Sequence, residues 1–196
     1  ARALELAGLG VDDLDLVDLY SCFPSAVQVA AAEIGLPTDD PARPLTVTGG
    51  LTFAGGPWNN YVMHSIATMA EKLAARPGTR GLITANGGYL TKHAFGVYSA
   101  EPPAAEFRWE DVQGAVDREP TRCALADWAG VGTVETWTTP FDRDGVPEKA
   151  FVAVRTPDDA RALALIADPA AARDTVREDI AGAKIRVHAD GTASLV

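Results

Sequence analysis

The chain has 196 residues, of which 47% are apolar, and its formal net charge is −10. The apolar share is enough for a folded core and excludes a disordered chain. The negative charge argues against nucleic acid and anionic membranes as partners. Two cysteines and the absence of CxxC or HExxH patterns exclude a disulfide framework and a recognisable metal site. No signal-like segment or run of the ~18 apolar residues that span a bilayer is present, so we expect a cytoplasmic protein.

The first half of the chain alternates strand-like and helix-like segments. In chain order the predicted elements are a helix end at 4–10, a strand at 15–20, a helix from Ser21 or Pro24 to Gly35, a strand at 45–48, a helix from Asn59 or Asn60 to about 75, and strands at 81–85 and 90–99. On the second helix an apolar stripe predicts that both Met63 and Met69 lie in the core. This order predicts an α/β layer whose sheet is mixed and has a parallel centre.

The second half has a different pattern. We expect a domain at 1–104, a connector at 105–130 and a small domain at 131–196. The last of these contains predicted strands at 132–141, 148–156 and 161–167, a helix from Asp168 to Gly182, and a hairpin around Asp190-Gly191. Three strands, a helix and two strands is the order of an OB-like β-barrel, and we expect a structural or docking barrel here.

Polar side chains gather near the glycine turns at 49–50, 55–56 and 87–88. Amide groups of Asn59, Asn60 and Asn86 could serve an oxyanion or a thioester carbonyl, or could simply cap helices and form turns. Tyr20 and Ser21 lie between a strand and a helix, where ligand crevices form in open α/β sheets. The glycines match neither a P-loop nor a dinucleotide fingerprint, and ordinary turn formation is the alternative explanation for them.

Three stretches carry a family resemblance: VDLYSCFPSAVQVAAAEIGL, TVTGGLTFAGGPWNNYVMHSIATMAEKL and GLITANGGYLTKHAFGVYS. They resemble, over roughly residues 1–100, the C-terminal half of the thiolase superfamily, and most closely its sterol carrier protein X-like acetyl-CoA acetyltransferases. Residues 20–23 stand where the family has Asn-Glu-Ala-Phe or His-Asp-Cys-Phe. Gly55-Gly56-Pro57 stands for Gly-His-Pro, and Ala85-Asn86-Gly87 stands for Cys-x-Gly. The rest of the chain resembles an extra C-terminal barrel of bacterial thiolase-like proteins.

The resemblance implies a thiolase-like layered α/β domain with a mixed sheet, followed by the OB-like barrel. It implies an acyltransferase of lipid metabolism that takes a coenzyme A thioester as substrate or ligand and binds no cofactor tightly. The expected partners are acyl-CoA and an N-terminal thiolase half, in the same chain or a separate subunit, and a homodimer is open. Since thiolases carry their nucleophilic Cys in that N-terminal half, and since Gly56 and Ala85 replace the family's His and Cys, we expect the isolated chain to be inactive.

Candidate site residues follow from these motifs. The catalytic candidates are Tyr20, Tyr61 and His64. The substrate-binding candidates are Ser21, Phe23, Gly55, Gly56, Asn59, Asn60, Asn86, Gly87, Gly88 and His93. Two alternatives to acyl-CoA binding without turnover stay open: an aldolase or lyase that acts on a hydroxyacyl-CoA through a tyrosine, and a non-catalytic docking module.

Overall fold

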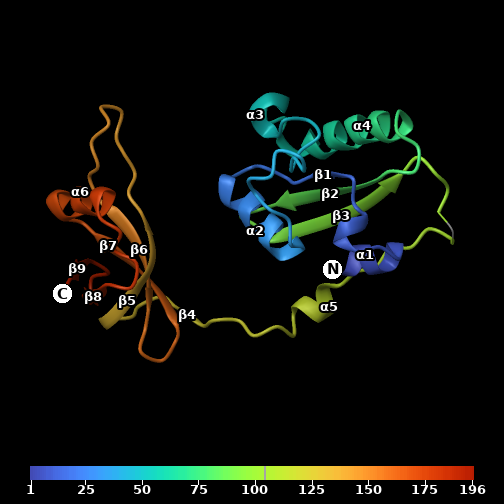
Figure 1. Cartoon of the computed structure of the whole chain (residues 1–196). Coiled ribbons are helices and arrows are strands. Elements are labelled where there is room, and N and C mark those ends of the chain that lie inside the picture. The colour runs from blue at the N-terminus through green and yellow to red at the C-terminus, as the bar shows by residue number, and fades with distance from the viewer. Residues whose placement is uncertain (104) are drawn as a thin grey trace. The chain divides into compact units, whose positions relative to one another are not determined.

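The computed structural model describes residues 1–103 and 105–196, and the chain divides into two compact units. The first unit is residues 1–111 and the second is residues 112–196 (Figure 1). The bounds that we expect for the connector stay a prediction. No helix in the described part of the chain combines the length and the apolar character that a bilayer crossing requires.

The first unit is a three-layer α/β arrangement around a three-stranded sheet. Its elements are α1 (Arg2–Ala7), η1 (Val11–Asp13), β1 (Leu16–Asp18), α2 (Pro24–Ile34), α3 (Leu51–Ala54), η2 (Trp58–Asn60), α4 (Tyr61–Ala74), β2 (Arg80–Gly87) and β3 (Lys92–Ser99). The strand order is β1-β2-β3, with β1 parallel and β3 antiparallel to β2. The predicted mixed sheet with a parallel pair is therefore confirmed.

Alternate residues of the sheet face two different helical layers. Val17, Leu19 and Leu82 pack with Leu4 of α1 and Ala31 of α2 on one face. Ile83 packs with residues of α4 on the other face. Figure 1 shows α4 on one side of the sheet and both α1 and α2 on the other. Period-two alternation in the strands thus fills two cores.

Helix α2 begins and ends where the sequence indicates, but its cap differs from the prediction. Pro24 occupies the first turn, and Gly35 ends the helix in the left-handed conformation at φ 87°. Phe23 stands at the N-cap position, so of the two predicted starts Pro24 is correct and Ser21 is wrong. The Ser21 hydroxyl instead accepts a hydrogen bond from the backbone N–H of Leu51, at 2.9 Å.

The segment at 45–48 is not the predicted strand. Asp18 provides the reason, because its buried carboxylate accepts the Val47 N–H at 2.9 Å and the Thr46 hydroxyl at 2.9 Å. The carbonyl oxygen of Leu45 accepts a backbone bond from the N–H of Leu19, just after the end of β1. The Asp18 side chain therefore binds polar groups of the segment at 45–48, which the backbone of a neighbouring strand would bind if this segment were a strand.

The apolar face of α4 is rotated relative to the predicted stripe. Its buried residues are Tyr61, Ser65, Met69 and Leu73. Met69 is fully buried as predicted, whereas Met63 is 60% exposed, so its core assignment is wrong. The predicted set and the observed set of buried residues both fit helical spacing. The hydrogen bonds of Tyr61 and Ser65 to Asp18 determine which set is buried.

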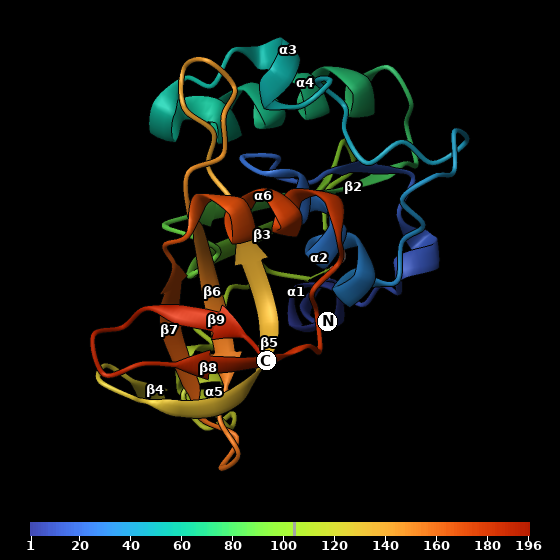
Figure 2. The same ribbon diagram turned by 90° about the vertical axis from the view of Figure 1, so that its left-hand side faces the viewer.

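The second unit is a curved six-stranded sheet with one helix packed on it. Its elements are α5 (Gln113–Val116), β4 (Ala124–Leu125), β5 (Gly130–Thr138), β6 (Ala150–Arg155), β7 (Arg161–Ile166), α6 (Pro169–Arg177), β8 (Lys184–Val187) and β9 (Ala193–Leu195). The strand order is β4-β7-β6-β5-β8-β9. Ala172 of α6 packs in one core with β-strand residues such as Val152 and Ile185 (Figure 2). An isolated bridge joins Leu165 to Thr192, but no closed barrel is shown among the described strands.

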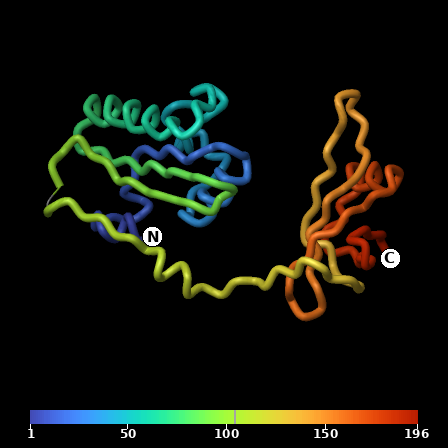
Figure 3. Tube along the Cα trace, turned by 180° about the vertical axis from the view of Figure 1, so that it is seen from behind, coloured from blue at the N-terminus to red at the C-terminus, as the bar shows by residue number. Residues whose placement is uncertain are grey.

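Two local features shape this sheet. Strand β5 carries a bulge between Val134 and Thr136. The connection from β5 to β6 extends beyond the strands that it joins (orange in Figure 3).

Helix α6 is capped at its start by Asp168, whose carboxylate accepts the Ala171 N–H, but it ends at Arg177 and not at the predicted Gly182. The predicted hairpin at Asp190-Gly191 is confirmed between β8 and β9.

Candidate functional site

A hollow of about 300 Å³ lies where β2 ends and β3 and α4 begin. It is lined by Tyr20, Asn59, Val62, Ala85, Asn86, Gly87, Lys92, His93 and Ala94. Five of these are predicted site residues: Tyr20, Asn59, Asn86, Gly87 and His93. They come from four separate segments, which the parallel pair β1–β2 and the hairpin β2–β3 bring to one end of the sheet.

The remaining predicted residues do not line this hollow. These are Ser21, Phe23, Gly55, Gly56, Asn60, Tyr61, His64 and Gly88. His64 is exposed on α4, whereas Tyr61 has no exposed surface at all. Burial of Tyr61 does not fit a direct catalytic role for its hydroxyl. The site roles of the others stay predictions.

A buried carboxylate organises the polar groups behind the hollow. Asp18 Oδ1 accepts the hydroxyls of Tyr61 at 2.9 Å and Ser65 at 2.8 Å. Its Oδ2 accepts the Thr46 hydroxyl and the Val47 N–H, so bonds from α4 and from the segment after α2 meet on one side chain. Burial raises the pKa of Tyr61, so this phenol keeps its proton and donates a hydrogen bond to Asp18. The network ties helix α4 to strand β1.

A glycine turn lets the segment after this network approach β1 closely. Gly50 has a positive φ of 77°, and a Cβ placed there would lie 2.7 Å from Ser21 Oγ. Any other residue would therefore disturb both the backbone conformation and the contact with Ser21. This turn leads into α3 and the glycines at 55–56.

Tyr20 is held in the hollow by two contacts. Its backbone N–H donates to Thr84 Oγ1 at 2.9 Å. Its ring meets the Tyr61 ring edge-on, with centroids 5.2 Å apart and planes at 87°. Partial burial raises the pKa of Tyr20, and the neighbouring Cys22 adds to the effect. At neutral pH Tyr20 is therefore a proton donor and not a base.

Asn86 connects the hollow to Cys22. Its Nδ2 donates to Cys22 Sγ at 3.1 Å. Its Oδ1 is buried and has no hydrogen-bond partner in the described part of the chain. An unpaired buried carbonyl is costly, so the bond to Cys22 holds the Asn86 side chain at an energetic cost. The sequence interpretation missed Cys22 as the partner of Asn86.

Charge in the hollow differs from charge over the whole chain. Lys92 contributes an ammonium group, and none of the nine lining residues is Asp or Glu. The chain as a whole carries a net charge of −10. Lys92 was also missed from the sequence, although the predicted hairpin returns past the Gly87-Gly88 turn and so brings it near Gly87, its partner in the β2–β3 ladder.

The tip of the β2–β3 hairpin is held by His93. Its Nε2 lies 3.0 Å from the carbonyl oxygen of Leu90, which has a positive φ of 61°. The imidazole also stacks on Phe95, with centroids 6.0 Å apart and planes at 9°. These two contacts fix the orientation of a ring that lines the hollow.

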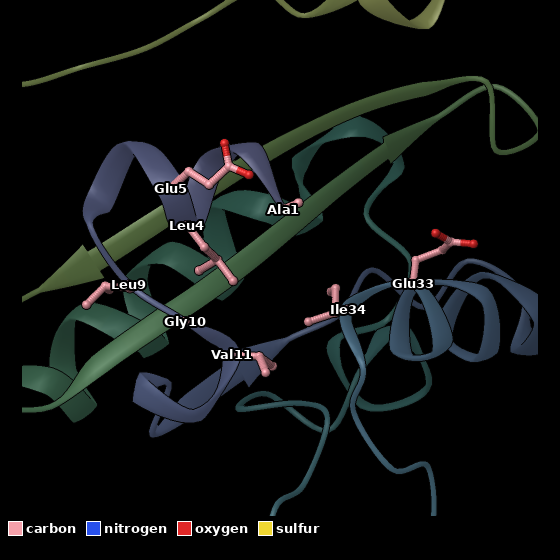
Figure 4. Close-up of a pocket in the computed structure, with 8 residues that line it drawn as sticks. All are labelled: Ala1, Leu4, Glu5, Leu9, Gly10, Val11, Glu33 and Ile34. Carbon is pink, nitrogen blue, oxygen red and sulfur yellow. The ribbon is translucent and has the colours of Figure 1, made fainter.

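A second hollow, of about 250 Å³, lies between α1 and the end of α2 (Figure 4). Leu4, Val11 and Ile34 give it aliphatic walls, and Glu5 and Glu33 are its charged residues. None of the predicted site residues lines it. Within the described residues no group of three or more His, Cys, Asp or Glu side chains is placed to hold a metal ion.

Comparisons with known proteins agree on one family. Residues 111–192 match the family model for the thiolase-like protein type 1 additional C-terminal domain. Among solved structures, a monomeric SCP2-thiolase-like protein type 1 from Mycobacterium smegmatis is 37% identical with a TM-score of 0.83. That match covers 100% of this chain but only 43% of the neighbour, so the chain spans less than half of the neighbour's length. No curated protein matches the chain. The two matches together identify this chain as a thiolase-like protein.

Proposed function

We propose that this chain forms part of a coenzyme A thioester-binding site in a thiolase-like protein of acyl-CoA metabolism whose usual catalytic His and Cys are replaced. One observation carries the proposal. Tyr20 from the first motif, Asn59 from just after the second and Ala85-Asn86-Gly87 of the third line the same hollow. The first and third motifs, together with a residue just after the second, thus contribute to one site although helices separate them in sequence.

The lining suits binding of a thioester better than standard thiolase turnover. The Tyr20 hydroxyl and the Asn59 amide are donors for a carbonyl oxygen. Ala85, where the family has Cys, offers only a methyl group, and Gly56, where the family has His, has no side chain. Proton transfer at the substrate's α-carbon and activation of a nucleophile both lack their usual groups.

Exposed aromatic side chains support an N-terminal thiolase half as the partner of the first unit. Phe53, Trp58 and Tyr89 are all more than 80% exposed. Large apolar groups in such number on one unit favour a protein surface that covers them. The neighbour's greater length agrees with this. We further propose that the second unit is an OB-like barrel and serves as a docking module. A homodimer is also a proposal.

A lyase is the second candidate function, and Tyr20 favours it. Its hydroxyl has no hydrogen-bond partner in the described residues, and its raised pKa keeps it protonated. Tyr20 would therefore act as the acid that protonates a leaving carbanion or enolate, not as the base. If Tyr20→Phe leaves carbon–carbon cleavage of every active hydroxyacyl-CoA unchanged, this role is excluded.

The experiment for the main proposal is calorimetric titration with acetyl-CoA. Both this chain and the longest natural form found by mass spectrometry in the native host are titrated. Loss of one hydrogen bond costs ~1 kcal/mol, so Asn59→Ala should weaken binding about fivefold. Asn60→Ala is the matched control because the adjacent Asn60 lies outside the lining. Absence of acetyl-CoA binding in both preparations, or equal effects of the two variants, contradicts the proposal.

A further inference from the structure

We propose that the hollow selects an acyl group that ends in a carboxylate, and that Lys92 holds this carboxylate. The inference rests on the proposed function and names the substrate class of the same site. Its motivation is a cation in the lining of the hollow, Lys92, with no acidic side chain among the lining residues.

The charge of the lining favours an anion. Lys92 is the one Lys or Arg side chain among the nine lining residues, and no carboxylate lines the hollow with it. Among the described residues, no Asp or Glu forms an ion pair with its ammonium group. A carboxylate in the hollow would therefore meet a cation that no acidic side chain of the described residues neutralises.

Lys92 also argues against an apolar acyl tail. A hydrocarbon chain would lie against its ammonium group without offering a hydrogen-bond acceptor. A terminal carboxylate offers acceptor oxygens and the opposite charge.

Size limits the acyl group to a short one. The hollow's volume of about 300 Å³ lies at the small end of the range for ligand sites. Its apolar wall consists of Val62, Ala85 and Ala94. A short methylene segment fits against this wall while its terminal carboxylate reaches Lys92.

The test compares adipoyl-CoA with hexanoyl-CoA by calorimetric titration. The two thioesters share coenzyme A and six acyl carbons, and they differ in the terminal carboxylate. Since Lys92 is exposed, we expect adipoyl-CoA to bind about three- to fivefold more tightly, and we expect added NaCl to reduce this preference. Lys92→Met should reduce the preference below twofold, and Lys92→Arg should retain most of it. Lys72→Met, on the exposed face of α4, is the matched control and should change nothing.

The outcomes separate the two proposals. If hexanoyl-CoA binds as tightly as adipoyl-CoA, or if Lys92→Met keeps the preference, the inference is wrong and thioester binding still stands. If neither thioester binds, the proposed function itself fails. Far-UV circular dichroism of each variant shows whether its overall secondary structure is retained.

Discussion

Replacement of Asp18 by Asn tests the buried network that ties α4 to β1. The carboxylate accepts four hydrogen bonds of 2.8–2.9 Å, from three hydroxyls and one backbone N–H. A hydrogen bond to a charged group is worth ~1.5–3 kcal/mol, and a neutral one ~0.5–1.5. Four bonds that each lose about 1 kcal/mol give about 4 kcal/mol, and the lower cost of burying a neutral amide offsets part of this. We therefore expect Asp18→Asn to lower the free energy of unfolding by about 2–4 kcal/mol.

The assay is urea denaturation followed by circular dichroism, with hydrogen exchange at β2 to assign the transition to the first unit. Asp12→Asn is the matched control, since the Asp12 side chain is 98% exposed. The same chemical change there should stay within about 0.5 kcal/mol. A value for Asp18→Asn inside that range would refute the reasoning, because the carboxylate would then contribute no more than a surface group.

Two further predictions concern the second unit. Gly132→Ala should destabilise it by ~1–3 kcal/mol in urea denaturation, because the new methyl would lie 2.7 Å from the carbonyl oxygen of Arg155. Gly114→Ala, whose nearest atom is 3.9 Å away, is the control and should not destabilise. Hydrogen bonding to Arg161 lowers the pKa of Glu135 below its usual value of 4.5, so its stabilising effect is complete above that value and is lost as pH falls through the lower folded-state pKa. Glu135→Gln should flatten the acid side of a stability–pH curve, and an unchanged acid side would contradict the assignment.

The sequence predicts elements whose signals are local. Pro24 and Gly35 mark the two ends of α2 correctly because each residue acts on its own backbone. The segment at 45–48 has a strand-like composition, yet Asp18, nearly thirty positions upstream, binds its polar groups. Such a contact leaves no trace in a short window of sequence. The phase of α4 is hidden for the same reason, since it depends on buried hydroxyls that bond to Asp18.

The same distinction between local signals and long-range contacts applies to the residues of the candidate site. Tyr20, Asn86 and His93 follow strand ends or turns, and topology brings such positions together. Tyr61 and His64 lie three positions apart on one helix, which separates them by only about 60° around its axis, yet Tyr61 is buried and His64 is exposed. Motif spacing identifies the loops of the site, but the orientation of each side chain depends on how the helices pack.

The bulge in β5 has a consequence for how this strand tolerates changes in length. The ladder advances two residues in β5, from Val134 to Thr136, for one residue in β6, so Glu135 is the extra residue. Deleting it would restore regular alternation and leave Val134 and Trp137 on the core side. Deleting a residue from the middle of β6 would instead turn buried side chains outward. Homologues that differ in length within this sheet should therefore gain or lose their residue at position 135 and not in β6.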